Sequence, residues 1–202
     1  MNVPDLLARR RIGLSWAFAV VFVVALLLSR SWHEGSLAAA ALFFAGLLLV
    51  GLATVGRLWC SLFISGYKGA ELITVGPYSV TRNPLYFFSL LGALGVGLAT
   101  ETVTFVVVFA FGFLLVYPST IAREEADLRA RFGQAFEDYC ARTPRFWPRW
   151  SSLREPDSYV VSPRIFRRSM GEVVWFVWLV GIIELVEALH ELAMVRPLVR
   201  LP

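Results

Sequence analysis

Residues 84–121, PLYFFSLLGALGVGLATETVTFVVVFAFGFLLVYPSTI, hold two long apolar runs that are interrupted only by the polar stretch 99–102, ATET. The runs cover about 84–100 and 102–121, and apolar segments of this length are typical of membrane-spanning helices. Helices are expected because lipid offers no hydrogen bonds to an open backbone. With so short a connection, the second helix must run back along the first. The stretch therefore predicts a tight antiparallel helical hairpin within a membrane.

Three further apolar runs lie outside the hairpin, at about 13–29, 37–55 and 172–189. The first follows three arginines, as in a signal peptide, but no small-residue cleavage site comes after it, and we expect a retained anchor. The chain has 202 residues, of which 57% are hydrophobic and 17% are charged, with a mean hydropathy of +0.66. These features predict an all-α polytopic membrane protein with about five transmembrane helices.

The basic residues are distributed unevenly between the two sides of this predicted membrane protein. Sixteen of the 19 Lys and Arg side chains lie before the first run, between the second and third, or between the fourth and fifth. The positive-inside rule then places the N-terminus in the cytoplasm, and we expect a bacterial inner membrane. The positive charge follows this face, so we expect no nucleic-acid partner. Arg145, Trp147, Arg149 and Trp150 fit an interfacial belt better than an RNA-binding patch.

Cys60 and Cys140 are the two cysteines of the chain. Neither has the spacing of a metal ligand, and Cys140 has no histidine near it in the sequence. A reducing compartment also argues against a disulfide. We expect both cysteines to be structural, and we expect no metal site.

The polar stretch at 76–88, GPYSVTRNPLYFF, predicts how the third helix starts. Asn83 is a favoured N-cap residue, and Pro84 suits the first helical position because its missing N–H is not needed there. The helix would enter the bilayer at the cytoplasmic boundary, with its positive dipole end facing that side. Arg82 adds a guanidinium at the same point. The stretch therefore predicts a site for an anionic group such as a carboxylate.

Gly92, Gly95 and Gly97 lie close together in the third run. Small residues allow helices to pack closely in membranes, and spacing alone favours this interpretation. The alternative is that the missing side chains leave room for a flat ligand beside the backbone.

Glu124 and Glu125 lie where the fourth run ends. Adjacent side chains on a helix point about 100° apart, so the two carboxylates cannot face the same neighbour. One of them can face a polar cavity while the other pairs with Arg82 or Arg129. The alternative is an ordinary solvated helix in which Glu125 and Arg129 form an i,i+4 surface pair.

The ordered motifs between residues 66 and 150 resemble the isoprenylcysteine carboxyl methyltransferase-like family, to which the phospholipid methyltransferases look related. The family pattern is a Gly-Pro-Tyr turn, an Arg-His-Pro-x-Tyr helix start, a helical hairpin, Glu-Glu, and an aromatic segment that closes on Pro-Arg-aromatic-x-Pro. The matching residues are Gly76-Pro77-Tyr78, Arg82-Asn83-Pro84-Leu85-Tyr86, Glu124-Glu125, Phe132-Gly133, Phe136, Tyr139, Pro144-Arg145-Phe146 and Pro148. Asn83 departs from the pattern, which usually has histidine there, and an amide cannot titrate near neutral pH.

The resemblance implies a cytoplasmic S-adenosylmethionine pocket and methyl transfer to a lipophilic or lipid acceptor at the membrane. It implies that Arg82 and the helix start at Pro84 meet the cofactor carboxylate, and that Glu124 or Glu125 takes its ribose hydroxyls or amino group. The cofactor-binding residues implied are Tyr78, Arg82, Asn83, Pro84, Tyr86, Gly95, Gly97, Glu124 and Glu125. The catalytic residues implied are Arg82, Asn83 and Glu125.

The resemblance also divides the chain into three regions. These are N-terminal transmembrane helices at 1–65, a methyltransferase-like cofactor-binding core at 66–150, and a linker with a C-terminal transmembrane helix at 151–202. The C-terminal half of the fifth run and the two residues after it carry Glu184, Glu187, His190 and Glu191. They pack against another helix, reach the outer interface, or contact a substrate or ion, and these alternatives stay open.

Two alternative functions are compatible with the sequence. A membrane reductase with a related helical core would use NADPH, although the short loops look small for that cofactor. A non-catalytic membrane scaffold would explain the glycine-rich helix but not the ordered polar motifs.

Overall fold

The computed structural model describes residues 19–32, 35–67 and 71–202, and it confirms the all-α prediction. Residues 19–28 form an apolar helix, which is the described part of the run predicted at 13–29. The other elements, in chain order, are β1 (Ser29–Ser31), α2 (Leu37–Ile64), α3 (Pro77–Val80), α4 (Pro84–Ala99), α5 (Val103–Phe132), α6 (Gln134–Arg142), η1 (Trp150–Ser152), α7 (Pro163–Val173), α8 (Trp175–Glu191) and β2 (Val199–Leu201).

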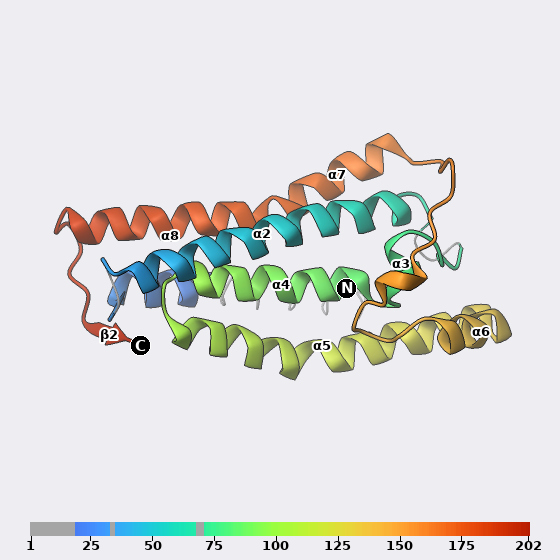
Figure 1. The fold of residues 1–202 in the computed structure, drawn as a ribbon, viewed down its shortest axis with the longest axis horizontal. Coiled ribbons are helices and arrows are strands. Elements are labelled where there is room, and N and C mark those ends of the chain that lie inside the picture. Colours follow the sequence, from blue (N-terminus) through green and yellow to red (C-terminus); the bar gives the residue numbers. More distant parts are fainter. Residues whose placement is uncertain (1–18, 33–34, 68–70) are drawn as a thin grey trace, which may run out of the picture.

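The hairpin predicted from the opening stretch consists of α4 and α5 (Figure 1). Three residues connect the helices, and the middle one, Glu101, has a positive φ of 56°. The Thr100 hydroxyl donates to the carbonyl oxygen of Gly97 at 2.7 Å and lies 2.9 Å from the Thr102 hydroxyl. The turn therefore satisfies these polar groups within the chain, as a turn near lipid requires.

Three helical segments in the described residues are long and apolar enough to cross a membrane: Leu37–Ile64, Val103–Phe132 and Pro163–Glu191, the last made of α7 and α8. The apolar helices Ala19–Leu28 and Pro84–Ala99 are shorter. The chain is therefore an integral membrane protein, and within the residues that the structure describes, three of the five predicted spans are long enough on their own.

The length of α5 places its C-terminal part outside the membrane. A helix of 30 residues is about 45 Å long, whereas the hydrocarbon core is about 30 Å thick. Its last third therefore projects beyond the lipid, toward the end of the molecule that carries α3 and α6 (Figure 1). Glu124 and Glu125 lie in this projecting part.

Glycines allow α4 to approach both α2 and α5 closely. A Cβ on Gly46 of α2 would lie 2.7 Å from the backbone oxygen of Gly95, and a Cβ on Gly95 would lie 2.8 Å from that of Gly46. A Cβ on Gly97 would lie 2.9 Å from the Cα of Val106 in α5. Backbone atoms cannot move aside as flexible side chains do, so these contacts support the close-packing interpretation of the glycines.

The end of the chain returns to its first described segment. β2 pairs with β1 in parallel, with Ser29 opposite Val199, and the N–H of Val103 donates to the Pro202 carbonyl at 2.8 Å. These three-residue strands are not predicted from the sequence, since so short a segment carries no alternating pattern. The hydrophobic core near this end consists of Phe22, Leu26, Val50, Val96, Ala99, Phe105, Val180, Ile183 and Val186.

Candidate functional site

A cavity of about 870 Å³ lies at the end of the bundle that carries α3, α6 and α7. Its walls come from the last turns of α2, the start of α4, the second half of α5 and one face of α7. The predicted cofactor residues in its lining are Tyr78, Arg82, Asn83, Pro84, Tyr86 and Glu124. Segments from all three predicted regions of the chain thus meet around one cavity.

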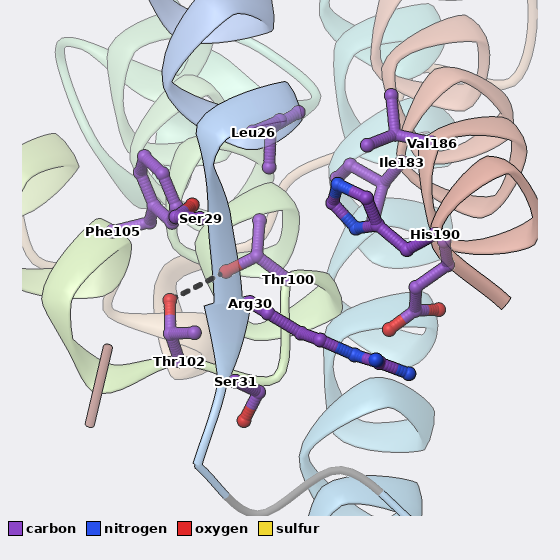
Figure 2. Close-up of a pocket in the computed structure, with 11 residues that line it drawn as sticks. Leu26, Ser29, Arg30, Ser31, Thr100, Thr102, Phe105, Ile183, Val186 and His190 are labelled. Atoms are coloured by element: carbon purple, nitrogen blue, oxygen red, sulfur yellow. Dashed lines mark hydrogen bonds between the residues drawn. The ribbon is translucent and has the colours of Figure 1, made fainter. Parts of the chain in front are cut away.

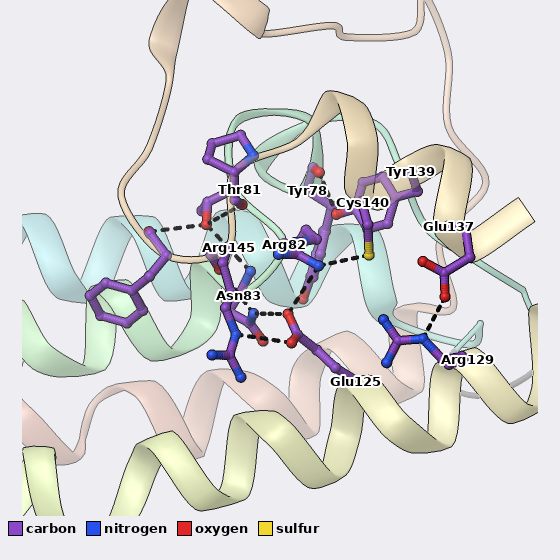
Figure 3. Close-up of polar contacts among 12 residues, drawn as sticks. Tyr78, Thr81, Arg82, Asn83, Glu125, Arg129, Glu137, Tyr139, Cys140 and Arg145 are labelled. Atoms are coloured by element: carbon purple, nitrogen blue, oxygen red, sulfur yellow. Dashed lines mark hydrogen bonds and ion pairs between the residues drawn. The ribbon is translucent and has the colours of Figure 1, made fainter.

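Asn83 lies at the N-cap position of α4, as predicted, but its side chain does not cap the helix. Its Nδ2 donates instead to Oε1 of Glu125 at 3.2 Å and to the carbonyl oxygen of Arg145 at 2.9 Å (Figure 3). The N–H groups of Tyr86 and Phe87 both bond to the Asn83 carbonyl. The predicted side-chain cap is wrong: a cap needs the amide oxygen as acceptor, whereas the side chain is held by the two bonds that its Nδ2 donates.

The adjacent carboxylates of Glu124 and Glu125 face different surroundings, as their helical spacing predicts. Glu125 is buried: its Oε2 accepts from Nε of Arg145 at 2.9 Å, and its Oε1 lies 3.5 Å from Nη1 of Arg82 (Figure 3). Glu124 is exposed and lines the cavity. One carboxylate is therefore held by the protein, and the other is available to a ligand.

Arg129 has a different partner from the one that the i,i+4 alternative predicts. Its Nε contacts Oε1 of Glu137 at 2.5 Å, and its guanidinium lies 5.5 Å from the ring centroid of Phe136. Both partners belong to α6, which follows Gly133, a residue with a positive φ of 50°. The surface pair with Glu125 is therefore wrong, and Arg129 docks α6 against α5 instead.

The segment between α6 and η1 lies against the segment between α3 and α4. The N–H of Arg82 donates to the Pro144 carbonyl at 2.9 Å, and the N–H of Arg149 donates to the Val80 carbonyl at 2.8 Å. The sequence pattern places Arg145 in an interfacial belt, but its guanidinium turns inward to the buried carboxylate. In the sequence, only the order of the family motifs hints that these two segments meet, because one motif begins the family pattern and the other ends it.

Arg82 has a hydrogen-bond donor that the described part of the chain leaves unused. Its Nη1 lies near Glu125 and 2.6 Å from Sγ of Cys140, a contact that the sequence does not predict. Its Nε is buried, and no described residue accepts a hydrogen bond from it. A buried guanidinium with a free donor can bind an anionic group of a ligand.

Residues 35–135, half of the chain, match the model of the phospholipid methyltransferases. The chain belongs to the phospholipid methyltransferase family. The match confirms the resemblance on which the sequence prediction rests. It includes Arg82, Asn83 and the two adjacent glutamates, but it ends before Arg145, so the segment that closes the buried network lies outside it.

Two curated proteins are similar to this phospholipid methyltransferase family member over almost their whole length. The nickel-cobalt-cadmium resistance protein NccN of Alcaligenes xylosoxydans xylosoxydans is 39% identical over 200 residues, which cover 99% of this chain and 93% of that protein. The cobalt-zinc-cadmium resistance protein CzcN of Cupriavidus metallidurans is 41% identical over 200 residues, covering 98% and 92% respectively. No solved structure matches the chain significantly.

Two tyrosines of this phospholipid methyltransferase family member are joined at the end of the cavity that carries α3 and α6. The Tyr139 hydroxyl donates to the Tyr78 carbonyl at 2.6 Å, which ties α6 to α3 (Figure 3). Burial raises the pKa of both hydroxyls well above their ordinary value. Neither hydroxyl therefore ionises near neutral pH, and the pair is suited to shape the cavity rather than to accept a proton.

An aromatic wall separates the cavity from the hairpin interior. The rings of Tyr86 and Tyr117 meet edge to face with centroids 5.3 Å apart, and Tyr117 stacks on Phe113 at 4.2 Å. Both tyrosines line the cavity, but Gly95 and Gly97 do not. The Gly-x-Gly at Gly95-Val96-Gly97 has its Cβ positions toward α2 and α5, so it packs helices together and lies outside the cavity lining.

The ionisable residues at the C-terminal end of α8 do not share one environment. His190 is buried, with Nε2 3.0 Å from the Leu27 carbonyl, and Glu187 and His190 line a cavity of about 30 Å³ beside Arg30 (Figure 2). Such a volume holds about one water molecule. Glu184 and Glu191 are exposed. The described residues contain no group of three or more His, Cys, Asp or Glu that could hold a metal ion.

Proposed function

We propose that the chain transfers a methyl group from S-adenosylmethionine to a lipophilic or lipid acceptor at the cytoplasmic side of the membrane. The observation that carries this proposal is that two adjacent carboxylates have different surroundings, one buried and paired and the other exposed in the cavity. Glu125 is engaged in a buried network that orients Arg82, while Glu124 and Arg82 both line the cavity. Membership in the phospholipid methyltransferase family supports the reaction type.

The cavity fits this cofactor in size and in chemistry. A volume of about 870 Å³ lies within the range of cofactor pockets. S-adenosylmethionine presents a carboxylate, an ammonium group, a sulfonium, ribose hydroxyls and a flat base. The lining offers arginine donors for the first, carboxylates for the cations and hydroxyls, and tyrosine rings for the base.

Several of these groups would then have a protein partner. Arg82, next to the positive end of α4, would hold the carboxylate of the cofactor. Glu124 would accept hydrogen bonds from the ribose hydroxyls or the amino group. Tyr78 and Tyr86 would line the base. Glu125 and Asn83 would act as positioning residues, because their polar atoms are already engaged with Arg82 and Arg145.

The chemistry needs positioning more than proton transfer. When bound, the cofactor supplies an electrophilic methyl group, whose bond to sulfur breaks with both electrons staying on sulfur as the acceptor's lone pair forms the new bond to carbon. The residues around the cavity would hold the two reactants in line, which is the main source of rate in such a displacement. The described lining contains no histidine, so a proton released by the acceptor would pass to Glu124, to Asp127 or to water.

The acceptor would reach the cavity from the membrane. The cavity would lie where α2 and α5 leave the lipid, with one part at hydrocarbon depth and another open to water. The distribution of Lys and Arg supports a cytoplasmic N-terminus and a cytoplasmic cavity. An amphiphile can then keep its chains in the bilayer while its polar head enters the cavity.

The proposal predicts that the purified protein binds S-adenosylhomocysteine and that Arg82→Ala weakens this binding by about tenfold or more. Isothermal titration calorimetry in detergent micelles measures the affinity. Arg123→Ala is the matched control, since Arg123 is exposed on α5 outside the cavity lining. Competition by NADPH would favour the reductase alternative, and binding of neither molecule would favour the scaffold.

The relatives named for metal resistance suggest the setting of this reaction. We propose that methyl transfer by this chain contributes to resistance against nickel, cobalt, zinc or cadmium. In a host that lacks the gene, the wild-type chain is expected to restore growth at elevated nickel or cadmium, and Arg82→Ala is expected to fail at equal expression. Full restoration by Arg82→Ala would show that resistance does not depend on the cavity.

A further inference from the structure

Arg57 lines the cavity but has no role in the proposed cofactor site. The apolar part of α2 runs for 20 residues from Leu37 to Gly56, which is about 30 Å of helix and the thickness of the hydrocarbon core. Arg57 follows at once, so it lies at the level of the lipid headgroups on the side of the cavity. An arginine at this position often extends outward along the lipid surface. Arg57 instead lines the cavity.

The surroundings of Arg57 leave its charge uncompensated. Its Nη1 donates to the hydroxyl of Ser89, which itself donates to the Leu85 carbonyl at 2.6 Å. Its guanidinium carbon lies 5.7 Å from the ring centroid of Phe176 on α8. Among the described residues, no carboxylate lies within 4.0 Å of Arg57, and its buried Nε has no hydrogen-bond partner. A cation near lipid without a counter-charge is costly, and such residues usually face a functional partner.

Arg57 and Arg82 lie at different depths along the same cavity. Ser89, the partner of Arg57, comes five residues after Pro84, which is about 8 Å deeper along α4 than the helix start beside Arg82. Ser61 of α2 is one turn from Arg57 and lines the cavity too. Two cations whose contact points on α4 lie about a turn and a half apart suit two separate anionic groups better than one.

We infer that Arg57 and Ser89 form an anion subsite for the negatively charged group, such as a phosphate, of an amphiphilic acceptor. The inference rests on the proposed methyl transfer and adds to it the two residues that would hold the acceptor's anionic group. The deeper cation holds the acceptor by its anion at headgroup level, and the shallower cation holds the cofactor by its carboxylate. The atom to be methylated then lies between the two, on the cytoplasmic side of the acceptor's anionic group.

The test compares a charged and a neutral short-chain amphiphile with the same tails, dihexanoyl phosphatidate and dihexanoylglycerol, by calorimetry on the full chain in a non-ionic detergent. The wild type is expected to prefer the phosphatidate, and Arg57→Gln is expected to weaken its binding by about tenfold or more. Arg57→Lys keeps the charge and is expected to retain part of the preference. Arg167→Gln is the matched control, since Arg167 makes the same charge change on an exposed face of α7 outside the cavity.

Three further measurements separate this inference from the proposed function and from misfolding. Circular dichroism and S-adenosylhomocysteine affinity are expected to match the wild type in Arg57→Gln.

Inorganic phosphate that binds in an Arg57-dependent way, without a gain from the acyl chains, would support the anion subsite but assign it to a free anion. Equal phosphatidate binding by wild type and Arg57→Gln would overturn the inference. If Arg57→Gln loses S-adenosylhomocysteine binding but keeps phosphatidate binding, the inference is overturned too, because Arg57 then belongs to the cofactor site. If no S-adenosylhomocysteine binds to the wild type, the proposed function fails while Arg57-dependent phosphatidate binding still supports the subsite.

Discussion

The Glu125→Ala substitution is expected to lower the free energy of unfolding by about 3 kcal/mol, because it removes one side of a buried ion pair. The Glu125 side chain is 11% exposed and contacts Arg82, Asn83 and Arg145. Without this carboxylate, the guanidinium of Arg82 stays buried with no counter-charge, and the Asn83 amide loses an acceptor. Arg145 adds less to the loss, since its side chain is 51% exposed and water can solvate it.

The neighbouring residue supplies the matched control for this prediction. Glu124→Ala removes the same group one position earlier on α5, but the side chain is exposed, so the free energy of unfolding is expected to change by about 0.5 kcal/mol or less. Thermal unfolding in detergent micelles, followed by far-ultraviolet circular dichroism, measures both. Similar losses at the two positions would contradict the assignment of Glu125 to a buried network.

Glu124→Ala, which changes stability less than Glu125→Ala, is expected to have a clear effect on ligand binding. At a temperature where both variants are folded, Glu124→Ala is expected to weaken S-adenosylhomocysteine binding by about tenfold, since it removes a carboxylate from the cavity wall. Glu125→Gln keeps one acceptor oxygen and is expected to bind more tightly than Glu125→Ala, because Arg82 stays oriented. Unchanged affinity in Glu124→Ala would remove this residue from the proposed cofactor site.

The Gly95→Ala substitution is expected to destabilise the fold by about 2 kcal/mol, because the new methyl group has no space. Its carbon would lie 2.8 Å from the backbone oxygen of Gly46 and 2.9 Å from the backbone nitrogen of Val50. α2 and α4 would have to separate, and helices in lipid are held together mainly by close packing. Loss of this contact also shifts Ser89 relative to Arg57, since they lie on the same two helices.

Gly112→Ala on α5 is the control for this substitution. No atom lies within 4 Å of the position that its Cβ would take. Alanine favours a helix over glycine, so this variant is expected to be as stable as the wild type or slightly more stable. If Gly95→Ala unfolds like the wild type but loses S-adenosylhomocysteine binding, the packing interpretation would be contradicted and the Gly-x-Gly would belong to the cofactor site.

Several features of the candidate site follow from local sequence rules alone. The helix start at Pro84 is predicted by residue type, because the fixed φ of proline suits the first helical position and its missing N–H is not needed there. The divergence of Glu124 and Glu125 follows from the angle between adjacent residues on a helix. Such rules concern contacts within one turn of the chain, which the residues themselves determine.

Other features of the site have no local signal. Asn83 donates to Glu125 and Arg145, 42 and 62 residues away, rather than to its own helix. Which partner a buried amide takes depends on which acceptors the fold brings within 3 Å, and single residues do not carry that information. The inward turn of Arg145 and the contact between Arg57 and Ser89 are of the same kind.

The sequence by itself determined that this chain lies in a membrane, that residues 84–121 fold back on themselves, and that polar motifs gather at the more basic end. Hydrophobic length, helix periodicity and charge asymmetry act along the chain and need no tertiary contact. The tertiary structure decided which of two adjacent carboxylates is buried, that Arg57 and Arg82 each keep a buried Nε without a partner among the described residues, and that the glycines pack helices rather than line the cavity. These outcomes depend on distances between segments far apart in the sequence, where a displacement of an ångström replaces a hydrogen bond by a clash.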